Sequence, residues 1–176
     1  MPGLALAFIS AEHMNGKESA NDLMREEVLA VHNRYRVELD IAPLVWSEKL
    51  AAHARQWANH LARSGGQLRH SKVLGEGENL WKGTAESFSD TEKVEYWAHK
   101  KKYFKSGIFP HVSTSGNWTD VGHYTQMIWR NTTEVGCAKA TSGKYDIFVC
   151  RYAPQGNIFT KKHDDLYEDR RYLTVE

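Results

Sequence analysis

The chain has 176 residues, and its 23 lysines and arginines against 22 aspartates and glutamates give a formal net charge of +1. Such a balance gives no electrostatic reason to expect nucleic acid or an anionic membrane as the main partner. No apolar run approaches the roughly 18 residues that span a bilayer. The length predicts one domain, which can bury a core without a metal or many disulfides.

The N-terminal segment is short and apolar, and small residues follow it. LALAFI at residues 4–9 precedes Ser10 and Ala11, as at the end of a secretory signal peptide, although no basic region comes before it. We expect three regions: a disordered arm or signal remnant over 1–18, the domain over 19–160 and a charged tail over 161–176.

Three segments have the apolar spacing of amphipathic helices, and each follows a serine that can cap a helix. The first is predicted to start at Ser19 and the second at Ser47. The third starts at Ser89, where Glu92 completes a capping box. Between the second and third helices, residues 65–88 are rich in glycine and polar side chains. We expect a long ordered loop there, and ordered loops of that length are usually functional.

A hairpin is predicted after the third helix. Residues 135–140 and 145–152 are rich in β-branched, aromatic and small apolar residues, and Gly143-Lys144 between them has the order of a type II′ turn. Counting outward from this turn places Cys137 opposite Cys150, the only two cysteines of the chain. Opposed residues lie about 4.5–5.5 Å apart, within the range of a disulfide. We predict the disulfide and therefore an oxidising compartment; the alternative is two reduced, buried thiols.

The stretch GHYTQMIWRNT, residues 122–132, is predicted to be a short helix whose Met127, Ile128 and Trp129 anchor in the core. His123 at its start is either a hydrogen-bonded core residue or a group placed for chemistry. The other histidines, apart from His70, are expected to lie on the surface or in packing.

Seven motifs occur in one order along the chain. They are HNRYR (32–36), HS (70–71), GENL (77–80), GHYTQMIW (122–129), VGCA (135–138), CRY (150–152) and GN (156–157). Together they strongly resemble the CAP superfamily of cysteine-rich secretory proteins, insect venom antigen 5 proteins and plant pathogenesis-related class-1 proteins. The most specific of them is GHYTQMIWRNT followed by a Gly-Cys strand.

This resemblance implies an α+β fold, namely a three-layer α-β-α sandwich with a small, mostly antiparallel sheet. It implies secretion to the extracellular space, or to the periplasm or cell envelope in a bacterium. It also implies a large cleft floored by two histidines and two acids that often hold a divalent ion. By position the histidines are His70 and His123 and the first acid is Glu78, and we place Gln126 in the same cleft.

The second acid of the family lies three residues after the tryptophan of the third helix. Counting from Trp97 leads to Lys100 in this chain. A lysine in place of a carboxylate removes a ligand, and at about 5 Å with an effective dielectric near 20 it repels a divalent ion by roughly 6 kcal/mol. We therefore expect no required cofactor and at best weak binding of zinc or another divalent ion by His70 and His123. Lys100 should pair with Glu78 or carry its ammonium to solvent.

Three functions fit these residues. We favour a secreted, monomeric binding or effector protein without turnover, whose ligand is a lipid, a sterol or an extracellular protein. No Gly-x-Ser-x-Gly motif, free reactive thiol or Gly-rich phosphate loop is visible in the sequence. The alternative is hydrolysis with Glu78 as general base and His70, His123 or a bound metal polarising a carbonyl. The third is a cell-envelope interaction module that docks through the tail from Lys161 to Glu176.

Overall fold

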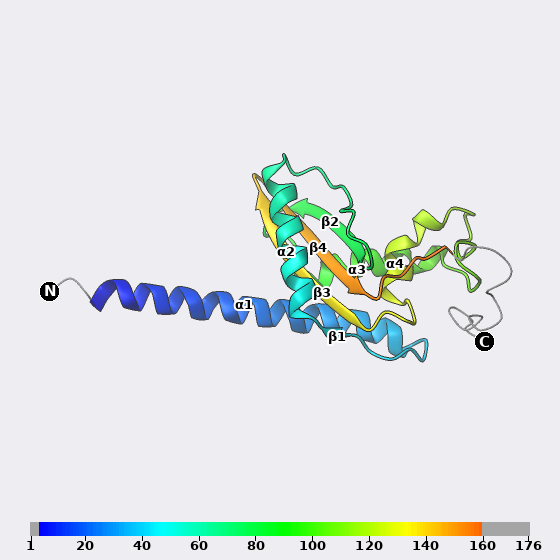
Figure 1. Cartoon of the computed structure of the whole chain (residues 1–176), viewed down its shortest axis with the longest axis horizontal. Helices are drawn as coiled ribbons and strands as arrows, with labels where there is room; N and C mark the ends of the chain where they lie inside the picture. The colour runs from blue at the N-terminus through cyan, green and yellow to red at the C-terminus, as the bar shows by residue number, and fades with distance from the viewer. Residues whose placement is uncertain (1–3, 160–176) are drawn as a thin grey trace.

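A computed structural model describes residues 4–159 of the chain, with side chains from Ala20 onward (Figure 1). Its α-helices are α1 (Leu4–Val37), α2 (Glu48–Arg63), α3 (Asp90–Ala98) and α4 (Gly122–Met127). Two 3₁₀ helices are η1 (His99–Tyr103) and η2 (Trp118–Asp120). The strands are β1 (Val45–Trp46), β2 (Gly77–Thr84), β3 (Glu134–Ser142) and β4 (Tyr145–Ala153).

The four strands form one sheet in the order β1-β3-β4-β2, in which only the β1–β3 pair is parallel. Helix α2 covers one face, and α1, α3 and α4 cover the other (Figure 1). Successive side chains of a strand point to opposite faces, so neighbours in sequence join different cores. In β4, Val149 packs with α2, whereas Cys150 packs in the core on the side of α1, α3 and α4. The predicted three-layer sandwich with a small, mostly antiparallel sheet is confirmed.

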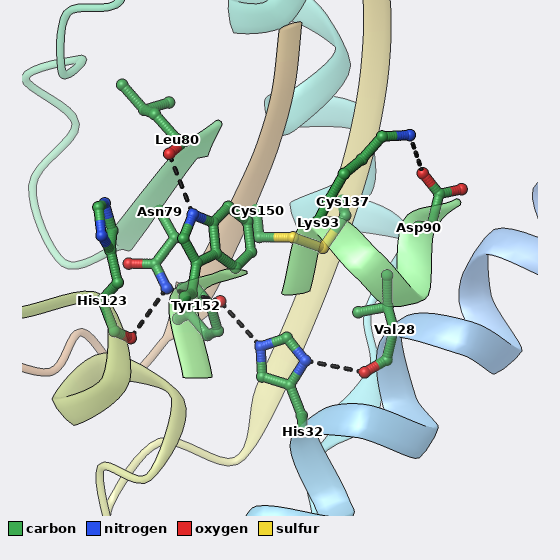
Figure 2. The surroundings of a disulfide bond; sticks show 11 residues. Val28, His32, Asn79, Leu80, Asp90, Lys93, His123, Cys137, Cys150 and Tyr152 are labelled. Atoms are coloured by element: carbon green, nitrogen blue, oxygen red, sulfur yellow. Dashed lines mark hydrogen bonds and ion pairs between the residues drawn. A yellow bond between two sulfur atoms is a disulfide. The ribbon is translucent and has the colours of Figure 1, made fainter. Parts of the chain in front are cut away.

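The predicted hairpin is confirmed in turn, register and disulfide. Ser142 pairs with Tyr145 across a two-residue turn in which Gly143 has φ +57°. A positive φ at the first turn position is what a type II′ turn requires. The same register sets Cys137 opposite Cys150, and the two form a disulfide with a Cα–Cα separation of 4.1 Å (Figure 2).

The helix starts agree with the sequence at two serines and differ at the third. At α3 the Ser89 hydroxyl accepts a hydrogen bond from the Glu92 amide at 3.1 Å, and the Glu92 carboxylate accepts one from the Ser89 amide at 2.8 Å. Ser47 is the N-cap residue of α2, without a side-chain capping bond. The predicted start at Ser19 is wrong, because α1 already begins at Leu4. No proline interrupts the chain between these two positions.

The segment 65–88 is not the uninterrupted loop that we expected, because β2 lies within it. Its glycines and polar residues hide the strand in the sequence. Every residue of β2 has a partner on β4, from Gly77 opposite Tyr152 to Thr84 opposite Tyr145. Pairing supplied by β4 therefore overrides the weak strand propensity of GENLWKGT.

Helix α1 begins at Leu4, but no side chain before Ala20 is described. The assignment of 1–18 to an arm or signal remnant therefore stays a prediction. The predicted tail, 161–176, lies outside the described residues. No helix within residues 4–159 is both long and apolar enough to cross a membrane.

Candidate functional site

The GHYTQMIW segment forms α4 and the turn after it, and it is anchored as predicted. Met127 and Ile128 are fully buried and Trp129 is nearly so. His123 lies in the first turn of α4, where its backbone carbonyl accepts a hydrogen bond from the side-chain Nδ2 of Asn79 at 3.1 Å (Figure 2). Its ring stacks against Trp97 of α3, with the ring centroids 6.0 Å apart. The helix thus fixes His123 between β2 and α3.

His123 differs from a core histidine held by hydrogen bonds. His32 is such a residue: its ring contacts the Val28 carbonyl at 2.8 Å and the Tyr152 hydroxyl at 2.9 Å (Figure 2). The His123 ring makes no hydrogen bond to any described residue and is only partly exposed. Burial, together with the nearby charges of His70 and Lys100, lowers the pKa of His123 to about 4. At neutral pH it therefore presents a neutral imidazole that is free to bind a ligand.

His70 and Glu78 form a direct pair. The His70 Nδ1 lies 2.7 Å from the Glu78 Oε1, which also accepts a hydrogen bond from the Ser71 amide at 3.0 Å. The two partners are unequally exposed, since 64 % of the His70 side chain but only 6 % of the Glu78 side chain is open to solvent. The imidazole therefore faces solvent, while the carboxylate that holds it lies inside.

Arg151 of β4 is the main counter-charge of this carboxylate. It stands directly opposite Glu78 in the β2–β4 register, and its Nη2 lies 3.3 Å from the Glu78 Oε2. Burial alone would raise the pKa of Glu78, but the hydrogen bond from His70 and the charge of Arg151 hold the pKa below its ordinary value. At neutral pH the Glu78 carboxylate is therefore ionised, and Arg151 balances its negative charge.

The same guanidinium reaches a second carboxylate. The Arg151 Nη1 lies 3.6 Å from the Glu76 Oε2, and the Glu76 Oε1 lies 2.7 Å from the His53 Nδ1 on α2. A chain of five groups thus runs from His53 through Glu76, Arg151 and Glu78 to His70. Neither Arg151 nor Glu76 was among the site residues predicted from the sequence. The signal that could have revealed them is the β2–β4 register, which was hidden because β2 itself was missed.

Lys100 does not pair with Glu78, so the first of our two expectations for it is wrong. The second, an ammonium carried to solvent, stays a prediction. Within the described part of the chain its ammonium forms no ion pair and lies over the Tyr96 ring, 5.8 Å from the centroid. The Glu78 carboxylate is instead paired with His70, 2.7 Å from its Oε1, and with Arg151, 3.3 Å from its Oε2. Lys100 is partly buried, in the second position of η1, one turn after Trp97. It stands close enough to His123 to help lower its pKa.

These residues do not fit a zinc ion. A tetrahedral zinc site needs three or four nitrogen, sulfur or oxygen ligands from the protein. Two imidazoles are at hand, but binding of Glu78 to a metal would compete with Arg151, which is 2 % exposed and would lose a partner. Lys100 adds a positive charge beside His123. Among the described residues no group of three or more histidines, cysteines, aspartates and glutamates is arranged to hold a metal.

The Gln126 side chain, which we placed in the cleft, forms its hydrogen bonds inside the protein. Its side chain is almost fully buried: Oε1 accepts a hydrogen bond from the Gly156 amide at 3.0 Å, and Nε2 contacts the Thr132 hydroxyl at 3.3 Å. Oε1 also lies against Gly77, where an added Cβ would come within 2.0 Å of it. Gln126 therefore holds α4 to the start of β2 and to the segment after β4.

Comparisons with known proteins agree with this fold and motif order. The model of the CAP family, the cysteine-rich secretory protein family, matches residues 29–152. Pathogenesis-related protein 1C of Nicotiana tabacum is 35% identical over 139 residues, covering 78% of this chain and 79% of its own. Pathogenesis-related protein 1 of Arabidopsis thaliana is 32% identical, covering 78% of this chain and 81% of its own.

Solved structures with the same fold are more distant in sequence. BmVAL-1 superposes with a TM-score of 0.64 at 24% identity, covering 79% of this chain and 80% of its own. The crystal structure of NaASP2 with Zn²⁺ gives a TM-score of 0.64 at 21% identity, covering 78% of this chain and 83% of its own. At these identities the likeness shows the fold alone.

Proposed function

Because the chain belongs to the CAP family of cysteine-rich secretory proteins, we propose that it is an extracellular binding or effector protein rather than an enzyme. Its ligand is a lipid, a sterol or a partner protein that meets a cleft bordered by His70, Glu78 and His123. The buried disulfide between Cys137 and Cys150 supports the location, since such bonds persist in oxidising compartments.

The observation that carries this proposal is the ion pair between Arg151 and Glu78. A general base needs a pKa near the working pH and room to take up a proton. The pKa of Glu78 lies below its ordinary value. Its Oε1 is hydrogen-bonded to His70 and to the Ser71 amide, and its Oε2 is ion-paired with Arg151, without a hydrogen bond to any described residue. The acid of the site is therefore a structural group, which suits binding better than catalysis.

The loop that carries His70 supports an apolar ligand or partner. Three of its large apolar side chains are exposed, namely Leu68, Val73 and Leu74, the last of them 95 % exposed. Exposed apolar side chains in a loop beside a site are typical of surfaces that bind lipids or proteins.

A hydrolase is the second candidate, and one contact favours it. The carboxylate of Glu78 orients the His70 ring through Nδ1, which leaves Nε2 to take a proton, as in catalytic His–carboxylate pairs. The hydroxyl next to it belongs to Ser71, and it is buried without a hydrogen-bond partner among the described residues. A water molecule would therefore have to serve as the nucleophile.

Two measurements on the protein purified from its native source test these functions. Mass spectrometry of an organic extract should reveal a bound lipid or sterol, and affinity purification should otherwise reveal a stoichiometric protein partner. Absence of both would contradict a binding function. Turnover of casein or a peptide that disappears in both His70→Ala and His123→Ala would establish the hydrolase instead. Docking through residues 161–176 stays a prediction, tested by removing them.

A further inference from the structure

Two Asn-x-Thr sequons, the acceptor motif for N-linked glycans, occur in the chain: Asn117-Trp118-Thr119 and Asn131-Thr132-Thr133. Glycans are attached to such motifs on the surface of proteins that pass through the eukaryotic secretory pathway. Both asparagines are exposed, so exposure alone does not separate the two motifs. The hydrogen bonds of the threonine in each motif do separate them.

The first sequon forms an Asx turn at the start of η2. The Asn117 Oδ1 accepts a hydrogen bond from the Thr119 amide at 3.2 Å, as asparagine often does with the backbone two residues on. This bond holds the amide oxygen against the backbone, and Nδ2, on the other side of the same carbon, points away from it. No described residue accepts a hydrogen bond from Nδ2 or from the hydroxyl of Thr119, which is itself exposed. Both groups of the motif are therefore open to an enzyme.

The contacts that hold this turn lie within one loop. Trp118, the middle residue, packs edge-to-face against Phe109, with the ring centroids 5.1 Å apart. The Asp120 amide donates to the Asn117 carbonyl at 3.2 Å, and the Ser115 hydroxyl donates to the Asp120 carboxylate at 2.6 Å. Because these partners are close in sequence, the turn does not depend on the pairing of the sheet.

The second sequon is closed by the sheet. The Thr133 amide donates to the Ala153 carbonyl of β4 at 2.9 Å instead of to Asn131, and the Thr133 carbonyl accepts a hydrogen bond from the Val45 amide of β1 at 3.0 Å. Its middle residue, Thr132, is fully buried. A hairpin closes in about 1–10 μs once its strands are free. We therefore expect β4 to bind Thr133 before an enzyme can modify this motif.

We propose that Asn117 is the N-glycosylation site of this protein and that Asn131 stays unmodified. The co-reactant is a polyprenyl diphosphate oligosaccharide. The Asn117 Nδ2 forms a bond to the anomeric carbon of the first sugar, while the bond from that carbon to the diphosphate oxygen breaks. The diphosphate leaves with the electron pair, and Nδ2 gives one proton to a base of the transferase. This inference rests on the extracellular location proposed above, and it adds a modification that involves none of the residues of the proposed cleft.

Secretion from mammalian cells tests the site. The full chain is fused to a cleavable secretory signal, and the secreted protein is compared by electrophoresis before and after digestion with a peptide-N-glycosidase. We expect one band shift that is lost in Asn117→Gln and in Thr119→Ala. Asn131→Gln and Thr133→Ala remove the same groups from the other sequon, and the shift should be kept in both. Mass spectrometry of the unaltered protein locates the glycan without any variant, because the digestion converts the glycosylated asparagine to aspartate.

A glycan on Asn131, or no band shift in the unaltered secreted protein, would overturn the inference. Failure of the proposed location looks different. If the secreted recombinant protein carries a glycan on Asn117 but the protein from its native source carries none, the acceptor site stands and passage through a eukaryotic secretory pathway falls. A search for ligands and partners that finds neither contradicts the binding function and leaves the glycan on Asn117 unchanged.

Discussion

The guanidinium of Arg151 lies 3.3 Å from the Glu78 carboxylate, and both side chains are almost completely removed from solvent. A buried carboxylate paired in this way is a poor metal ligand and a poor base, because either role leaves a buried charge without its partner. We therefore expect this pair to disfavour a divalent ion between the histidines and the acids. It also explains why Lys100 forms no ion pair with Glu78.

The first prediction concerns this pair. Arg151→Gln leaves Glu76 and Glu78 buried without a cation and should lower the free energy of unfolding by about 3–5 kcal/mol at pH 7. Arg151→Lys keeps the charge and should lose less. Urea unfolding of both variants measures the difference, and a loss below about 1 kcal/mol in Arg151→Gln would show that the pair contributes little.

The second prediction is a loss of stability in mild acid. Burial lowers the pKa values of His32 and His123 from 6.5 to about 4, so between these values the unfolded chain binds more protons than the folded one. Stability is then fully present above pH 6.5 and falls as the pH drops toward 4. Each histidine should remove about 2 kcal/mol between pH 7 and pH 5. His123→Gln should reduce this fall by about that amount; an unchanged pH dependence would exclude His123 as a cause.

The third prediction concerns the disulfide. Cys137 and Cys150 are 13 residues apart, and closing a loop of this size stabilises a protein by about 3 kcal/mol in the chain-entropy estimate. The double variant Cys137→Ala/Cys150→Ala should lose about that amount in thermal or urea unfolding and keep the hairpin register. Loss of the hairpin itself, seen as missing cross-strand nuclear Overhauser effects, would mean that the disulfide is needed for the pairing.

Local signals made several parts of the fold predictable. The Gly143-Lys144 turn set the hairpin register, and the register paired Cys137 with Cys150. The order of motifs indicated the family, which the family comparison confirms.

The other parts depend on long-range contacts. Strand β2 could not be found from GENLWKGT alone, because its partner β4 lies more than sixty residues away in sequence. The contacts of Glu78 with Arg151 follow from that pairing, so they were missed as well. For the same reason the sequence could not show that Lys100 forms no ion pair with Glu78. Nor could it show that the Gln126 side chain is buried and hydrogen-bonded inside the protein.

The fourth prediction tests the contact between Gln126 and Gly77. A Cβ at Gly77 would lie 2.0 Å from the Gln126 Oε1, and the three nearest atoms all belong to this one side chain. Gly77→Ala should therefore cost about 1–3 kcal/mol in the unaltered protein but less than 1 kcal/mol when Gln126 is already alanine. Equal costs in the two backgrounds would mean that the strand start is strained for another reason.

We propose that the charges of Arg151 and Lys100 keep this site from holding a divalent cation. Calorimetric titration of the full chain with zinc at pH 7 tests it most directly, with Lys100→Glu as the comparison and Lys102→Glu as the matched control for net charge. We predict no stoichiometric zinc binding to the unaltered protein or to Lys102→Glu, and a measurable gain in Lys100→Glu. Tight binding of one zinc ion by the unaltered protein, lost in His123→Ala, would show that the site does hold a divalent cation.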